Sequence, residues 1–147
     1  MDGTALIGRQ GEDFIFAREQ ARLAENLPVH AKLVLPLYKM KAQRIGCDIL
    51  TYDDDGRPVC LEVKTTTNNS QVFSMTKNEL QMADKFTKDG IPYFITFLNH
   101  WDTPQQTVQD ISYEDFLQNY DAEALRYHCT PKKEPRAHIS DRSRPLP

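Results

Sequence analysis

Residues 46–67 constrain the fold most strongly, because their pattern is typical of a β-hairpin. Two runs rich in apolar and β-branched residues, 46–52 and 57–67, flank an acidic turn at 53–56 that ends in glycine. Glycine supplies the positive φ that a tight turn between antiparallel strands needs. The pattern therefore predicts two antiparallel strands joined by a short turn.

The second strand of this hairpin carries the side chains that indicate a chemical site. Successive strand residues point to opposite faces, so Glu62 and Lys64 share one face while Leu61 and Val63 share the other. Asp48 lies near the start of the first strand, and pairing around the turn brings it close to Glu62 and Lys64. Two carboxylates and one ammonium group are therefore expected on one surface.

Hard divalent cations bind oxygen, and Mg²⁺ usually takes one or two carboxylates while water and substrate phosphates complete its coordination. Asp48 and Glu62 fit this role for Mg²⁺ or Mn²⁺, and the backbone carbonyl of Val63 is a third candidate ligand. The alternative is structural. Glu62 and Lys64 would then form a solvated surface ion pair worth only ~0.2 to 1 kcal/mol.

An aspartate, a spacer containing a turn, and Glu-x-Lys on a strand resemble the signature of the PD-(D/E)xK nucleases, which share the restriction-endonuclease-like fold. The resemblance is carried by Asp48, Glu62 and Lys64. The proline that gives the signature its first letter is absent, because Cys47 occupies its place.

The sequence around this motif, at 46–49, 61–66 and 73–79, looks more specifically like the domain at the carboxy-terminal end of the plant protein NO VEIN. This resemblance covers roughly residues 8–117. Related domains occur widely in prokaryotic proteins, often beside helicase or defence-related domains. The resemblance implies an α/β fold, a three-layer sandwich in which helices flank a mixed sheet.

The same resemblance implies metal-dependent hydrolysis of phosphodiester bonds, with DNA favoured, in a defence, restriction or repair context. Its catalytic residues would be Asp48, Glu62 and Lys64, and Glu12 in the first helix would reach toward the metal. Lys64 would orient a water, and would act as a general base only with a pKa well below its ordinary ~10.4. For Glu12 the alternative role is a favourable interaction with the helix dipole. The alternative function is an inactive module of the same fold that binds nucleic acid or a protein partner.

The net charge of −3 argues against a nucleic-acid binder. Residues 26–47, however, contain no acidic residue. The basic residues of this segment are Lys32, Lys39, Lys41 and Arg44. They are candidates for phosphate contacts, and a merely solvated basic face is an equal alternative.

The other elements follow from periodicity and capping signals. We expect a helix over 4–26, a loop or edge strand over 29–38, and a third antiparallel strand over 71–75. A capping box formed by Thr76 and Glu79 predicts the start of a second long helix. The helix over 4–26 is expected to pack on the sheet through an apolar stripe of Phe14, Ala17, Ala21 and Ala24.

After these elements, the continuous apolar run at 93–98 predicts a buried central strand. An edge strand is expected over 108–112, then a helix from Ser112 and a short helix over 121–127. The acidic side chain of Glu79 is explained by its helix cap without any catalytic role.

The chain length and the local composition favour one domain over 1–130 and a flexible basic tail over 131–147. The tail holds four prolines, five basic and two acidic residues. No apolar run approaches the ~20 residues that cross a bilayer, so we expect no membrane contact and a cytoplasmic location. Three cysteines without metal-finger spacing favour reduced thiols. Nucleic acid is the expected partner. Cleavage is expected either to have little specificity or to be directed by a targeting subunit, and a homodimer would place two sites on opposite strands.

Overall fold

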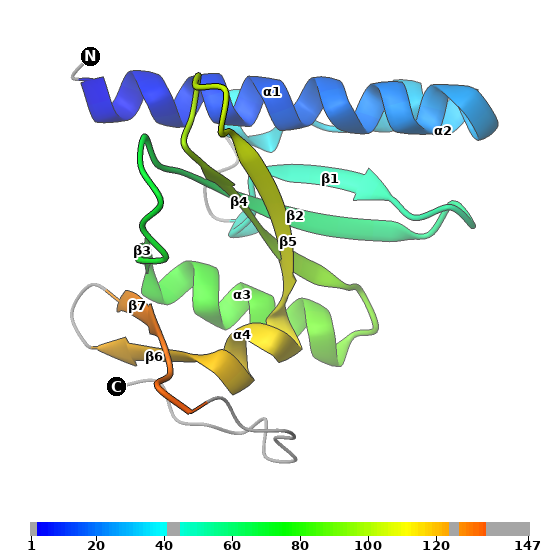
Figure 1. The fold of residues 1–147 in the computed structure, drawn as a ribbon. Helices are drawn as coiled ribbons and strands as arrows, with labels where there is room; N and C mark the ends of the chain where they lie inside the picture. Colours follow the sequence, from blue (N-terminus) through cyan, green and yellow to red (C-terminus); the bar gives the residue numbers. More distant parts are fainter. Residues whose placement is uncertain (1–2, 41–44, 124–126, 135–147) are drawn as a thin grey trace.

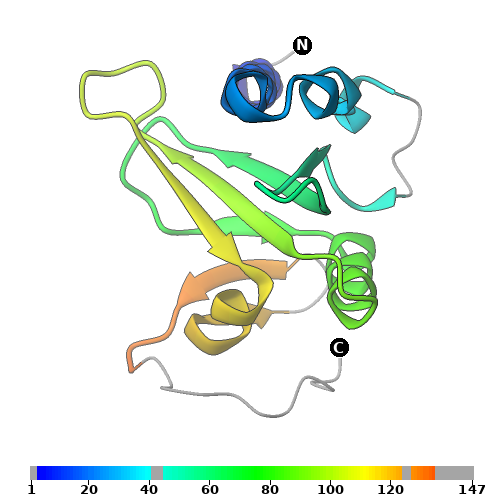
Figure 2. The same cartoon turned by 90° about the vertical axis from the view of Figure 1, so that its right-hand side faces the viewer.

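The computed structural model describes residues 3–40, 45–123 and 127–134, which form three layers (Figures 1 and 2). Helices α1 (Gly3–Asn26) and α2 (Pro28–Leu33) cover one face of a four-stranded sheet. Two further helices and a small second sheet cover the other face. The predicted α/β arrangement of a mixed sheet flanked by helices is confirmed. Among the described helices, none combines the length and the hydrophobicity needed to cross a membrane.

The main sheet has the strand order β1-β2-β4-β5. Strands β1 (Ile49–Tyr52) and β2 (Pro58–Thr65) form the predicted antiparallel hairpin. Strand β2 runs parallel to β4 (Tyr93–Asn99), and β4 runs antiparallel to β5 (Thr107–Ser112). Strand β4 is central and largely buried, as its continuous apolar sequence predicts.

Helix α1 packs on the sheet through a different face from the one that the apolar pattern selects. Its buried residues are Gly11, Ile15, Glu19 and Leu23, which follow one another at intervals of four. The predicted apolar stripe is wrong, because all four of its members are exposed: Phe14, Ala17, Ala21 and Ala24.

A buried carboxylate explains this error. Glu19 is only 3% exposed, and it accepts hydrogen bonds from Thr51 Oγ1 at 3.0 Å and Arg22 Nη2 at 2.8 Å. Its second oxygen lies 3.1 Å from Arg18 Nε. Because these partners satisfy the charge, a polar residue occupies the middle of the buried face.

The segment after α1 is helical where a loop or edge strand was predicted. Pro28 begins α2, in agreement with the preference of proline for the first helical turn. A short 3₁₀ helix, η1 (Leu37–Lys39), follows. Leu35 alone forms a β-bridge, with Leu50 of β1.

The opposite layer contains α3 (Lys77–Lys88) and α4 (Tyr113–Asn119). The predicted capping box at the start of α3 is confirmed, because Thr76 and Glu79 exchange side-chain and backbone hydrogen bonds. The predicted helix at Ser112 is also confirmed, since the Ser112 side chain accepts the Asp115 N–H at 3.1 Å.

A second sheet of order β3-β7-β6 completes this layer. Strand β3 (Phe73–Met75) pairs with β7 (Tyr127–Pro131) and not with β2, so the prediction of three antiparallel strands in one sheet is wrong. In the described part of the range 121–127, strand β6 (Tyr120–Glu123) and the first residue of β7 replace the predicted helix, and residues 124–126 lie outside the described residues. Of the predicted tail over 131–147, only 131–134 lie within the described residues.

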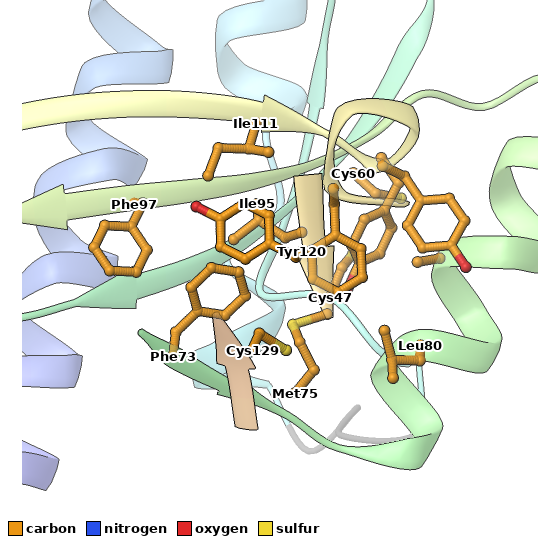
Figure 3. Close-up of a cluster of buried hydrophobic side chains, with 14 of the residues drawn as sticks. Cys47, Cys60, Phe73, Met75, Leu80, Ile95, Phe97, Ile111, Tyr120 and Cys129 are labelled. Atoms are coloured by element: carbon orange, nitrogen blue, oxygen red, sulfur yellow. The ribbon is translucent and has the colours of Figure 1, made fainter. Parts of the chain in front are cut away.

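Aromatic and sulfur-containing side chains fill the space between the main sheet and this layer (Figure 3). The ring of Phe73 lies 5.2 Å from that of Phe97 in β4 and 5.2 Å from that of Tyr120 in β6. Phe73 therefore attaches the small sheet to the main sheet, because aromatic pairs at such distances stabilise beyond their buried area.

Gly11 lets α1 approach β2 closely. A Cβ atom at this position would lie 2.0 Å from Thr65 Oγ1. We expect Gly11→Ala to lower the free energy of unfolding by about 1–3 kcal/mol, the usual cost of overpacking. Gly8→Ala is the matched control, because its Cβ would meet nothing within 4 Å and alanine favours the helix by ~1 kcal/mol. Urea unfolding compares the two variants, and equal stabilities would contradict the close approach.

Candidate functional site

The register of the hairpin places Asp48 beside the functional part of β2. Ile49 lies opposite Leu61, and the Asp48 N–H donates to the Leu61 carbonyl at 2.8 Å. Just beyond this pair, Asp48 Oδ2 accepts the Val63 N–H at 2.8 Å. The aspartate side chain thus continues the hydrogen bonding where the β1 backbone stops, and it is fixed next to Glu62.

Lys64 connects two carboxylates that come from different elements. Its Nζ lies 3.4 Å from Glu62 Oε2 in the same strand and 3.1 Å from Glu79 Oε1 in α3. The same Glu79 oxygen accepts the Thr76 N–H at 3.0 Å. The helix cap and the ion pair share one oxygen atom, so the first turn of α3 is fixed to β2.

Helix α1 contributes one further carboxyl group to the site, that of Glu12. The carboxyl group of Asp48 is hydrogen-bonded to those of both Glu12 and Glu62, so the three form a row with Asp48 in the middle. These three residues and Glu79 line one hollow of about 470 Å³. Carboxylates from α1, β2, α3 and the start of the hairpin therefore meet in one place.

Burial and mutual repulsion raise the pKa values of these acids. Burial, and then the charge of Asp48, raise the pKa of Glu12 to about 8. Burial raises the pKa of Glu62 well above its ordinary value, and Asp48 adds to this effect. Burial also raises the pKa of Asp48, although the Val63 N–H and Lys64 act in the opposite direction. Each of these three carboxyl groups therefore binds its proton more tightly than a solvated carboxyl group does, and a nearby cation would oppose this effect.

Lys64 keeps its positive charge in this environment. Burial lowers its pKa, but the carboxylates of Glu62 and Glu79 together raise it above the ordinary value. The condition for a general base, a strongly lowered pKa, is not met by these contacts. Lys64 is suited instead to donate hydrogen bonds and to offset negative charge.

The donor set suits a hard divalent cation that is shared with water or substrate. Asp48 and Glu62 offer carboxylate oxygens. The Val63 N–H points to Asp48, and because the N–H and C=O of one strand residue point the same way, its carbonyl faces this edge too. Across the three described ranges, no three His, Cys, Asp or Glu side chains form a group that would hold an ion by themselves. An ion here would need the carbonyl and outside ligands as well.

The basic residues predicted to contact phosphate have different positions. Lys39, in η1, has its Nζ 5.7 Å from the ring centroid of Tyr38, which lines the hollow. Lys32 is exposed on α2 and does not line the hollow. Lys41 and Arg44 lie outside the described residues.

Sequence reasoning missed Tyr38, which lines the hollow, and Arg9, whose Cζ lies 5.2 Å from the Tyr38 ring centroid. It gave Glu79 only the role of a helix cap. One signal was available for Arg9, because residues three apart on a helix lie on the same side and Glu12 was already a candidate. For Tyr38 the sequence gave no comparable signal, since the fold of 29–38 was itself predicted incorrectly.

Residues 11–107 match the family model described as Protein NO VEIN, C-terminal. The matched segment contains the whole row of carboxyl groups and both Lys64 and Glu79. No curated protein and no solved structure matches the chain.

The raised pKa of Glu12 predicts a pH-dependent stability. A carboxyl group with a folded-state pKa of about 8 binds its proton more tightly in the folded protein than in the unfolded chain. Its stabilising contribution is complete below the unfolded pKa of ~4.3 and is lost as the pH rises through about 8. In EDTA, the melting temperature of the wild-type protein should therefore fall between pH 5 and pH 8.5 relative to that of Glu12→Gln.

Scanning fluorimetry of both proteins across this range is the measurement. Added Mn²⁺ should raise the wild-type melting temperature more at pH 8.5 than at pH 5, because the ion competes with protons for the same oxygens. If the melting temperatures of the wild type and Glu12→Gln change with pH in the same way, the pKa of Glu12 is ordinary.

Proposed function

The chain belongs to the family of the carboxy-terminal domain of Protein NO VEIN, and we propose that it is a metal-dependent nuclease that hydrolyses phosphodiester bonds, with DNA as the favoured substrate. The observation that carries this proposal is the meeting of Asp48 and Glu62 in one hollow, with Lys64 Nζ 3.4 Å from Glu62. The sequence pattern that resembles PD-(D/E)xK nucleases thus corresponds to an arrangement in space.

Each side chain has a separate role in this proposal. Asp48, Glu62 and the Val63 carbonyl would hold Mg²⁺ or Mn²⁺, with Glu12 approaching from α1. Such an ion, when bound, polarises the scissile phosphate and makes a bound water more acidic. Lys64 donates a hydrogen bond to the attacking water or to a phosphate oxygen, and its charge offsets the negative charge that develops there. Glu79 positions the Lys64 ammonium at 3.1 Å.

Burial of the acids favours a functional site over a solvated ion pair. The side chain of Glu62 is 6% exposed and that of Lys64 is 17% exposed, whereas the structural alternative required a surface pair. Removing carboxylates from water costs free energy that their mutual repulsion increases. Such an arrangement is typical of sites that bind a cation or carry out chemistry.

The proposal predicts that the purified protein cuts DNA in Mg²⁺ or Mn²⁺ and does not cut it in EDTA. Glu62→Gln and Lys64→Ala should each lower the rate by about a hundredfold or more, the usual loss when a group that stabilises transition-state charge is removed. Plasmid nicking measured on gels, with melting temperatures as a check of folding, tests this expectation.

The matched control variants are Glu25→Gln and Lys85→Ala, which replace exposed residues of α1 and α3 and should keep full activity. Cutting that persists in EDTA, or that is unchanged in Lys64→Ala, would contradict the mechanism. Binding of DNA that requires no metal, without any cleavage, would favour the inactive module.

A further inference from the structure

Two cations lie on one aromatic ring at the edge of the hollow. Arg9 Cζ lies 5.2 Å from the ring centroid of Tyr38, and Lys39 Nζ lies 5.7 Å from the same centroid. We call these three residues the basic rim. An aromatic ring attracts cations, so Tyr38 holds together two like charges that would otherwise separate.

The basic rim is attached directly to the candidate site. The Tyr38 N–H donates to the Asp48 carbonyl at 2.9 Å, and its hydroxyl donates to Asp13 Oδ1 at 2.7 Å. Tyr38 also lines the hollow together with Glu12. Because backbone and side chain are both fixed, the two cations have a defined place next to the carboxylates.

The hollow is mainly acidic, so a phosphate chain needs positive charge beside it in order to bind. Four carboxyl groups line the hollow, and Lys64 is the cation that contacts two of them. A phosphodiester chain that approaches this acidic surface is repelled, unless positive charge stands along its path. Arg9 and Lys39 provide such charge at the α1 and η1 side of the hollow.

Lys39 is available for an outside ligand. Its ammonium lies 3.3 Å from Asp13 Oδ1, but the side chains are 48% and 49% exposed. Exposed ion pairs of this kind are weak, so a phosphate group can replace Asp13 as the partner of Lys39.

We infer that the basic rim binds a phosphate next to the scissile one, so that the substrate is a polynucleotide and not a small phosphate ester. The inference deepens the proposed function and rests on it. Phosphate contacts of this kind fix the position of the backbone without reading its sequence. The rim therefore contributes affinity and alignment and no base specificity.

The first test measures binding of a short fluorescein-labelled DNA duplex by anisotropy. Ca²⁺ replaces Mg²⁺, and gels verify that the duplex stays intact. Arg9→Gln and Lys39→Gln should each weaken binding about fivefold at about 0.15 M salt, and each should reduce the log–log salt slope by about 1, because each removes one phosphate contact.

Asp13→Asn is expected to change affinity in the opposite direction. The amide still accepts the Tyr38 hydroxyl, while Lys39 loses its competing carboxylate, so DNA binding should tighten. Arg57→Gln, which alters an exposed cation in the hairpin turn, is the control that should leave affinity unchanged. A merely structural role for the rim would lower the melting temperatures of the variants and would not produce opposite signs.

The second test compares cleavage of DNA with hydrolysis of bis(p-nitrophenyl) phosphate. Arg9→Gln and Lys39→Gln should raise KM for DNA. The decrease in kcat/KM that each variant causes should be at least several-fold greater for DNA than for the small diester. If both variants cut DNA as fast as the wild-type protein and their binding shows the same salt slope, this inference is overturned and the proposed function is not. A wild-type protein that neither binds nor cuts DNA would overturn the proposed function, and the inference with it.

Discussion

Acidic side chains are held away from water at one end of the main sheet, and their repulsion has to be balanced by the elements around them. Asp48 stands between Glu12 and Glu62, and it also accepts the Val63 N–H at 2.8 Å. This backbone bond fixes the aspartate to β2, while Lys64 provides the nearby positive charge. The raised pKa values of these acids indicate that the nearby positive charge does not fully compensate their burial and mutual repulsion.

Two helices complete the site, and each depends on a single local feature. Helix α1 can bring Glu12 to Asp48 because Gly11 has no side chain where the helix meets β2. Helix α3 is fixed because Glu79 caps its first turn and pairs with Lys64 through one oxygen. The geometry of the hollow is therefore tied to the packing of both layers, and distant changes in either layer can alter it.

Local patterns predicted the parts of the fold whose causes are local. The hairpin follows from alternation and turn residues, the start of α3 follows from a capping box, and the central position of β4 follows from its apolar sequence. The errors arose where partners lie far apart in the chain. Strand β3 pairs with β7 more than fifty residues later, and nothing within 71–75 encodes that choice. The buried face of α1 was misidentified because Glu19 is satisfied by Thr51 of β1 and by neighbouring arginines.

The amino-acid pattern was sufficient to identify three residues that could form a site, because the spacing of Asp48, Glu62 and Lys64 within one hairpin fixes their relative positions through strand geometry. The surroundings of these residues depend on how distant elements pack. Glu12, Tyr38 and Glu79 reach the hollow from elements that no hairpin pattern can locate. Burial by those elements, a property of the packed layers and not of any local segment, raises the pKa of Glu62, whereas the carboxylates of Glu62 and Glu79 raise the pKa of Lys64.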